Sequence, residues 1–167
     1  ILFYIYLAHW THFPFVSIKY FNNPKQFNDL TALNYNLTIS DKIQTKIKSE
    51  FAETKFSANS TKNFDMSIIK QLTRYTRSRL KPNANIDEDI EKIVFAEKEY
   101  NGICSAYSKL LITAAAALGI KARVVWLLGH TVSELYFADT GWTLVDANGN
   151  LIYRNKNTGK LASVTDL

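Results

Sequence analysis

The sequence predicts an α+β fold, in which several helices are followed by an antiparallel sheet. Two observations lead to this prediction. From residue 41 to residue 118 the apolar residues recur at helical spacing, and beyond Gly119 the period changes to two, in short runs rich in β-branched and aromatic residues. We expect a single domain over residues 1–167, with a mostly helical part at 1–99 and a central helix and sheet at 100–153.

The first helix is predicted at residues 41–54. Its apolar residues Ile43, Ile47 and Phe51 follow one another at four-residue steps, as on one face of a helix. Ser40 stands directly before it, and its hydroxyl can cap the first unpaired amides. A polar stretch at 57–63 is expected to form a loop.

The second helix is predicted at residues 65–79 and is closed by Pro82. Its apolar side carries Ile68, Ile69, Leu72 and Tyr75. Over the segment 65–81, the opposite side at helical spacing, called the basic stripe below, consists of Lys70, Arg74, Arg77 and Lys81. The basic stripe is either an ordinary solvated helix face or a docking surface for an anionic polymer or lipid headgroups.

Two further helices are predicted before the sheet. After a turn at 83–85, a short helix begins at Asp87 and ends in a loop that reaches Gly102. The stretch 104–118 is nearly all apolar, so this central helix is expected to be buried on most sides. Gly119 supplies the expected stop at its C-terminus.

Four strands are predicted in the last part of the chain, at 122–128, 130–138, 142–146 and 151–153. Turn-forming residues separate them, at Gly129, 139–141 and 148–149. Because the connections are short, the strands are expected to pair as antiparallel neighbours.

Composition excludes several classes of protein. Hydrophobic residues make up 47% and charged residues 21% of the chain, which is ordinary globular usage and argues against disorder, collagen or a coiled coil. The net charge of +5 favours acidic partners only weakly. No zinc-finger spacing or aromatic RNA-binding pattern is present, so a nucleic-acid partner is not expected.

The first residues are apolar but interrupted by His9, His12 and Pro14. They are too short a run for a bilayer span, so membrane association is not expected, although a membrane-proximal end stays open. The chain begins without a methionine and is expected to be a fragment of a longer precursor. His9 and His12 have no third ligand nearby and no calcium loop is present, so neither a metal nor another cofactor is expected.

Cys104 is the only cysteine, and it stands at the start of the central helix. A helix N-terminus favours the thiolate, which is the nucleophilic form of cysteine. A single cysteine forms no internal disulfide and leaves the cellular compartment open. On its own, such a residue is more often a small buried hydrophobe than a nucleophile.

His130 and Asp146 lie on two neighbouring predicted strands. Strand alternation puts His130 on one face with Glu134 and Tyr136. If the strands pair across the turn at 139–141, His130 and Asp146 come level at the same end of the sheet. Cys104, His130 and Asp146 would then be a nucleophile, a proton carrier and the carboxylate that fixes the tautomer of the imidazole.

Several blocks of sequence resemble one known family. They are residues 102–108 (GICSAYS), 117–125 (ALGIKARVV), 130–136 (HTVSELY) and 141–146 (GWTLVD). Together they resemble the nucleophile helix and the histidine and aspartate strands of the transglutaminase-like superfamily, over about residues 100–149. The resemblance implies a papain-like core, with a Cys-bearing helix packed on an antiparallel sheet. It also implies a thioester intermediate, resolved by water in hydrolases or by an amine in cross-linking enzymes.

The sequence departs from the family pattern at three positions. Val132 stands where an aromatic is common, Ile103 where animal cross-linking enzymes carry glutamine, and Ala147 where proline is frequent. The first two lie next to the expected base and nucleophile, and they favour hydrolysis over animal-type cross-linking.

Further site residues are expected around the three catalytic candidates. The backbone amide of Cys104 is a candidate oxyanion donor, and a second is expected from Tyr100 or Asn101. Four aromatic residues are candidates for a substrate groove, although aromatic residues at such spacings are often core residues. They are Tyr107, Trp126, Tyr136 and Trp142.

The functional hypothesis is a cysteine-dependent hydrolase or acyltransferase that acts on an amide bond of a peptide or an amide-bearing polymer. The alternative is a non-catalytic binding or scaffolding module on the same fold, which keeps the triad as a relic and docks anionic partners through the basic stripe. The sequence leaves the oligomeric state open.

Overall fold

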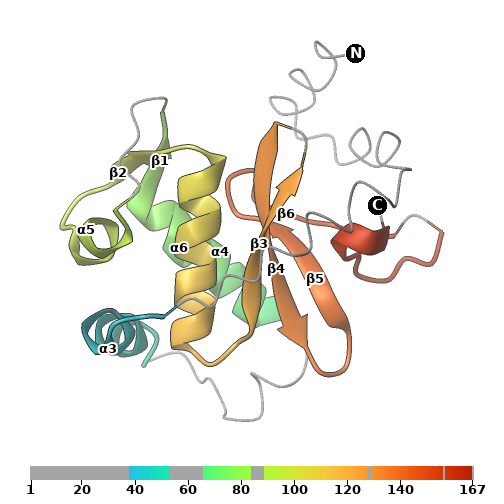
Figure 1. Cartoon of the computed structure of the whole chain (residues 1–167), viewed down its shortest axis with the longest axis horizontal. Helices are drawn as coiled ribbons and strands as arrows, with labels where there is room; N and C mark the ends of the chain where they lie inside the picture. Colours follow the sequence, from blue (N-terminus) through green and yellow to red (C-terminus); the bar gives the residue numbers. More distant parts are fainter. Residues whose placement is uncertain (1–37, 53–65, 84–88, 128, 156, 167) are drawn as a thin grey trace.

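The computed structural model describes residues 38–52, 66–83, 89–127, 129–155 and 157–166 (Figure 1). The sequence predictions for the apolar leader, for His9 and His12 and for the loop at 57–63 lie outside these residues.

Four α-helices stand where the sequence predicts them: α3 (Asp41–Glu50), α4 (Met66–Arg79), α5 (Ile90–Phe95) and α6 (Cys104–Ala117). The Ser40 side chain caps α3 by accepting from the amide of Ile43, as predicted. Asp89 caps α5 in the same way, so α5 begins three residues later than expected. With the sheet that follows, the predicted α+β fold is confirmed.

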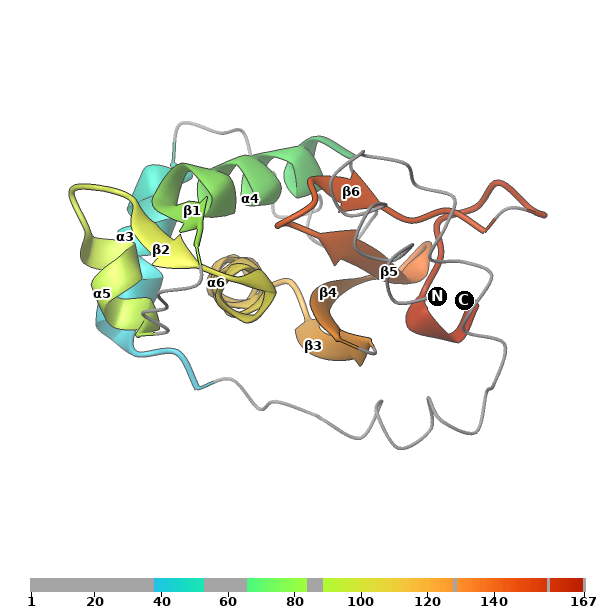
Figure 2. The ribbon, with the colours of Figure 1, turned by 90° about the horizontal axis from the view of Figure 1, so that it is seen from above.

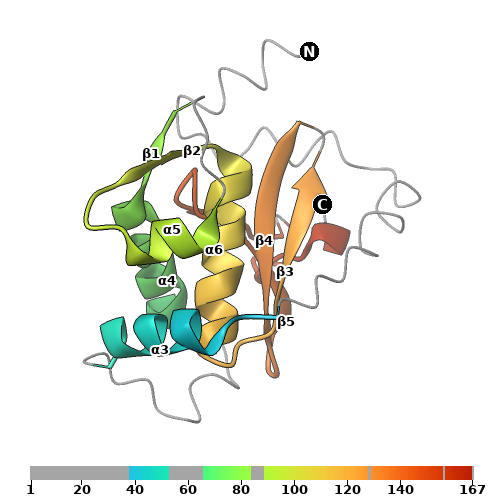
Figure 3. The same ribbon diagram turned by 60° about the vertical axis from the view of Figure 1, so that its left-hand side comes forward.

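Helix α6 forms the centre of the molecule. Its buried residues Leu110, Leu111 and Ala114 belong to the larger hydrophobic cluster, which also takes in Ile69 and Leu72 of α4 and Ile93 of α5. Figure 2 shows α6 end-on, with the sheet on one side, α3 and α5 on the other, and α4 running alongside towards β6. Figure 3 shows α3 and α5 on the side of α6 away from the sheet. The almost uniform apolarity of α6 follows from this position.

The sheet contains four antiparallel strands in chain order: β3 (Ala122–Leu127), β4 (His130–Phe137), β5 (Gly141–Asp146) and β6 (Leu151–Ile152). Strands β4 and β5 form the predicted hairpin, in which Phe137 pairs with Gly141 and Ser133 with Val145. This register carries the start of β4 and the end of β5 to the same edge of the sheet.

The two faces of the sheet pack against different elements. Leu135, Phe137 and Val145 join the cluster around α6. Residues of the other face form a second cluster with the C-terminal segment, which ends in the 3-10 helix η2 (Val164–Asp166). This second cluster consists of Val125, Leu127, Val132, Leu144, Tyr153, Ala162 and Val164.

Two short strands were not predicted. The strands β1 (Leu80–Pro82) and β2 (Tyr100–Gly102) pair in parallel, with Leu80 opposite Tyr100. Three residues are too few to show a period of two, so the sequence gives no signal for them. Their role in the fold is to lead the chain from α5 directly into the N-terminus of α6.

None of the helices in the described part of the chain is long and apolar enough to cross a bilayer.

Candidate active site

Cys104 is the first residue of α6 and is half-buried. The N-cap position is Ile103, whose side chain makes no capping hydrogen bond, and this differs from the capped α3 and α5. The first-turn amides of α6 therefore receive no acceptor from the N-cap side chain, and they add to a positive helix end beside the sulfur. The uncapped amides and the positive helix end both favour a thiolate at Cys104.

Hydrogen bonds tie α6 to strand β4 one turn beyond Cys104. The Ser108 hydroxyl donates to the carbonyl of Thr131 at 3.0 Å, and the Ser133 hydroxyl donates to the carbonyl of Ser108 at 3.3 Å. Both serines are buried. These bonds fix the position of α6 along β4, and therefore the position of Cys104 relative to His130. The sequence analysis assigned no role to either serine. The signal it missed is a hydroxyl one helical turn after Cys104 in a helix that is nearly all apolar.

The structure brings Cys104, His130 and Asp146 together. The His130 Nε2 atom lies 2.8 Å from Oδ2 of Asp146, and the Cys104 thiol hydrogen-bonds to the His130 side chain. Because Asp146 takes Nε2, the other ring nitrogen, Nδ1, is the one left for the sulfur. The imidazole therefore stands between the thiol and a carboxylate that fixes its orientation.

Asp146 is buried and held on both oxygens. Oδ1 accepts the backbone amide of Gly149 at 2.9 Å, while Oδ2 faces His130. A Cβ atom at residue 149 would stand only 2.8 Å from Oδ2. The turn after β5 thus needs glycine at this position, because the backbone approaches the carboxylate too closely for any side chain.

The electrostatics match a thiolate–imidazolium pair. Burial lowers the pKa of His130, but the hydrogen bonds with Asp146 and Cys104 and their negative charges outweigh it, and the pKa rises from 6.5 to about 9. Burial raises the pKa of Cys104, but the hydrogen bonds with His130 and Thr131 and the imidazolium charge outweigh it, and the pKa falls. The two shifts have opposite signs, and both favour the charged forms, imidazolium at His130 and thiolate at Cys104.

The four aromatic candidates for a substrate groove are not gathered in one place. Tyr107 is 1% exposed, and its hydroxyl donates to the carbonyl of Leu80 at 2.7 Å, so it is a core residue. Tyr136 and Trp142 pack edge-to-face with ring centroids 5.3 Å apart. Tyr136 is six residues along β4 from His130, which corresponds to about 20 Å of extended strand. Tyr107, Tyr136 and Trp142 therefore do not form a substrate groove beside Cys104, contrary to the prediction.

Trp126 is the aromatic candidate that lies near the nucleophile. It pairs across β3 and β4 with Thr131, the residue that contacts the Cys104 thiol. The Trp126 side chain is 58% exposed, an unusual amount for an indole. An exposed aromatic side chain therefore stands opposite the strand residue that contacts the sulfur.

The oxyanion candidates Tyr100 and Asn101 lie on β2, directly before the α6 N-terminus. Tyr100 packs against the cluster around α6, and Asn101 is exposed. The backbone of both residues leads into Cys104, whose own amide belongs to the uncapped first turn of α6.

A second buried carboxylate shares the sheet face of His130 and Asp146. Glu134 is fully buried, and its Oε2 lies 2.6 Å from Arg123. Its Oε1 accepts the amide of Val164 at 2.6 Å, so it also anchors the C-terminal segment. The guanidinium of Arg123 stacks over the Trp142 ring at 4.1 Å.

The residues of the basic stripe have different surroundings. Arg77 donates to the carbonyls of Ala147 and Asn148, and Lys81 forms an ion pair with Glu99 at 2.7 Å. Lys70 and Arg74 are exposed.

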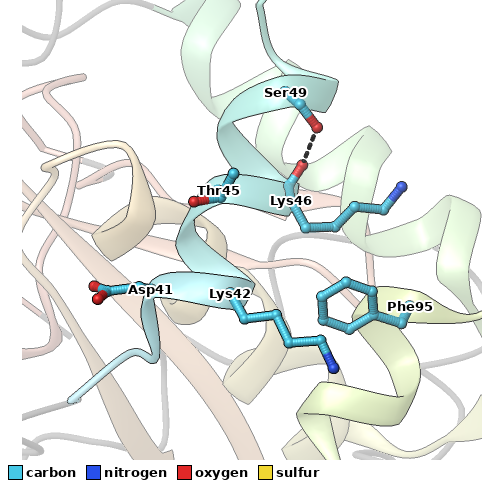
Figure 4. Close-up of a pocket in the computed structure, with 6 residues that line it drawn as sticks. All are labelled: Asp41, Lys42, Thr45, Lys46, Ser49 and Phe95. Carbon is cyan, nitrogen blue, oxygen red and sulfur yellow. Dashed lines mark hydrogen bonds between the residues drawn. The ribbon is translucent and has the colours of Figure 1, made fainter.

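A surface hollow lies away from these residues, between α3 and α5 (Figure 4). There the Lys42 ammonium stands over the Phe95 ring at 4.5 Å and pairs with Glu91 at 2.9 Å. Neither Cys104, His130 nor Asp146 lines this hollow, so it is not part of the candidate active site. The described residues hold no cluster of three or more His, Cys, Asp or Glu side chains suited to a metal ion.

Comparison with known families gives one match. A family model described as the transglutaminase-like superfamily matches residues 41–147. The match begins at α3 and ends one residue after Asp146. It therefore includes the helices as well as Cys104, His130 and Asp146. Searches among curated proteins and among solved structures found no match.

Proposed function

We propose that this chain, which belongs to the transglutaminase-like superfamily, is a cysteine-dependent hydrolase or acyltransferase that acts on an amide bond through Cys104, His130 and Asp146. Members of the superfamily usually rely on cysteine-based catalysis. One observation carries the finer proposal: a single imidazole contacts a half-buried thiol at a helix N-terminus and a buried carboxylate.

The first half of the proposed reaction transfers the acyl group to sulfur. The Cys104 thiolate attacks the amide carbon, a carbon–sulfur bond forms, and the carbonyl electrons move onto the oxygen. The first-turn amides of α6, including that of Cys104, face the developing oxyanion. The carbon–nitrogen bond then breaks, and the leaving nitrogen takes a proton from His130.

The second half returns the enzyme to its starting state. Water or an amine attacks the thioester while neutral His130 takes its proton, and the carbon–sulfur bond breaks to restore the thiolate. Asp146 holds the imidazole in one orientation and stabilises its charged form in both halves. We favour water as the acceptor, because the departures from the family pattern at Ile103 and Val132 lie near the nucleophile and the base.

The proposed substrate is a peptide or an amide-bearing polymer. Trp126 supports this class, because its exposed indole stands opposite the strand residue that contacts the sulfur and offers an apolar surface to residues flanking the reacting amide. Tyr107, Tyr136 and Trp142 are left out of the substrate site, since they lie in the core or along the sheet away from His130.

The alternative, docking of anionic partners through the basic stripe, has less support. Two of its four cations are engaged within the chain, Arg77 with backbone carbonyls and Lys81 with Glu99. If the docking function is correct, reversing the charge of Lys70 and Arg74 should abolish binding to anionic vesicles or polymers.

Intact mass spectrometry tests the proposal. The protein is incubated with a library of peptides that carry side-chain and backbone amides, with and without a primary amine. We expect an acyl adduct on Cys104 and a hydrolysed peptide, and both should be absent in Cys104→Ser. The appearance of an amine-linked product would identify transfer instead of hydrolysis. A protein that forms neither adduct nor product, while Cys104→Ser behaves identically, would contradict the proposal.

A further inference from the structure

Arg77 links α4 to the turn that follows strand β5. Its Nη1 atom donates to the carbonyl of Asn148 at 2.6 Å and to the carbonyl of Ala147 at 3.2 Å. These carbonyls lie 70 and 71 residues away in sequence. Arg77 therefore makes a long-range attachment, although the residue is exposed.

The same turn holds the carboxylate of Asp146. The amide of Gly149, the residue after Asn148, donates to Oδ1. Asp146 is thus hydrogen-bonded to the turn through one carboxylate oxygen and to His130 through the other. A shift of the turn would disturb the carboxylate, because the Gly149 amide is hydrogen-bonded to its Oδ1 atom.

We infer that Arg77 is a positioning residue for catalysis: by holding the carbonyls of Ala147 and Asn148, it keeps Asp146 at hydrogen-bonding distance from His130. This inference rests on the proposed function. A guanidinium suits the task, since its charge-assisted bonds to carbonyls are stronger than neutral ones and its planar donors hold a fixed geometry.

Arg79 provides a matched control on the same helix. It also donates to backbone carbonyls, with Nη1 at 2.8 Å from that of Val94 and 3.3 Å from that of Ala96, and it pairs with Glu50. These contacts hold α5 and α3, on the side of α6 away from the sheet. Arg79 therefore does the same structural work as Arg77 without touching the turn next to Asp146.

The test measures how the rate of Cys104 alkylation by iodoacetamide depends on pH in four proteins. They are the wild type, Arg77→Ala, Arg77→Lys and Arg79→Ala, each checked for folding by circular dichroism and thermal unfolding. When Asp146 loosens, the pKa of His130 falls and the thiolate loses its charged partner. In Arg77→Ala we expect the midpoint of the rate profile to move to higher pH by about one unit. At a given pH below the midpoint, the alkylation rate should then be about tenfold lower.

Arg77→Lys should restore part of the shift, because lysine keeps the charge and one donor direction. Arg79→Ala should unfold at a lower temperature and keep the wild-type profile. Identical profiles for Arg77→Ala and the wild type would overturn the inference and leave the proposed function standing. A wild-type thiol that titrates like free cysteine would instead count against the proposed function itself.

Discussion

Asp146 and Glu134 are buried carboxylates on the same face of the sheet, 2% and 0% exposed, yet their partners differ. Asp146 contacts an imidazole at the end of the sheet, next to a half-buried thiol. Glu134 lies in the middle of β4 and contacts the guanidinium of Arg123 and the amide of Val164.

The difference lies in whether the partner can lose its proton. A guanidinium stays charged at every accessible pH, so the Glu134–Arg123 pair can only hold the sheet and the C-terminal segment together. An imidazole can gain and lose a proton, so the carboxylate beside it can influence a proton transfer, as the proposed function requires. Burial of a carboxylate therefore does not by itself mark a catalytic role, and the partner decides.

The largest expected effect follows from replacing Asp146 with asparagine. The amide cannot stabilise the imidazolium, and it presents an NH2 group where the imidazole needs an acceptor. We expect turnover of an amide substrate to fall by about 10³–10⁴-fold, with the fold retained in circular dichroism. Activity within a few-fold of the wild type would show that Asp146 does not orient His130.

The next largest effect is on stability, in Glu134→Gln. This change leaves the partly buried Arg123 without its counter-ion, and we expect the free energy of unfolding to fall by about 3 kcal/mol in urea denaturation. Turnover per folded molecule should stay close to that of the wild type. A loss of turnover as large as in Asp146→Asn would erase the distinction between the two carboxylates.

A smaller effect is expected in Gly149→Ala. The added Cβ would stand 2.8 Å from the Asp146 carboxylate, so the turn or the carboxylate must move. We expect turnover to fall about tenfold, which corresponds to about 1.4 kcal/mol in the barrier. Gly159→Ala is the control, because Gly159 has a positive φ of 68° but no atom within 4 Å of the new Cβ. The control should lose stability and keep its turnover.

The smallest effect concerns pH and stability. The pKa of His130 is raised from 6.5 to about 9, so its stabilising contribution is fully present below pH 6.5 and is lost as the pH rises through about 9. A Cys104→Ser background removes the titration of the thiol and leaves Asp146 to raise the pKa of His130. In that background, adding His130→Gln should destabilise the protein more at pH 6 than at pH 9.5, by on the order of 1 kcal/mol.

Glu134→Gln in the same Cys104→Ser background gives the comparison. Because this substitution leaves His130 and Asp146 in place, we expect this variant to keep the pH dependence of its parent. An effect of His130→Gln that is equal at both pH values would show that Asp146 does not hold a charged imidazole.

The elements of the fold that depend on local signals were predictable. The cap at Ser40, the apolar period of α3 and the turns of the hairpin are encoded within a few residues. The register of that hairpin then brought His130 and Asp146 to one edge of the sheet, as the sequence predicted. Strands β1 and β2 were missed, because three residues carry no recognisable period. Their pairing also joins residues that are distant in the sequence, such as Leu80 and Tyr100.

The surroundings of the site depend on contacts between distant residues, and most of them could not be predicted. Strand alternation correctly put Tyr136 on the face of His130 but gave no weight to the distance along the strand. The uniform apolarity of α6 already indicated that Tyr107 is buried. The attachment of Arg77 to the turn at 147–150 has no local signal, since a helical arginine on a polar face reads as solvated.

The central claim is that Cys104 is a thiolate paired with the imidazolium of His130. Its most direct test is the pH dependence of iodoacetamide alkylation in the wild type and in His130→Ala. We predict that the wild type reacts with a midpoint well below the ordinary thiol pKa of about 8.5, and that His130→Ala returns the midpoint to that value. A wild-type midpoint near 8.5 that His130→Ala leaves unchanged would contradict the claim.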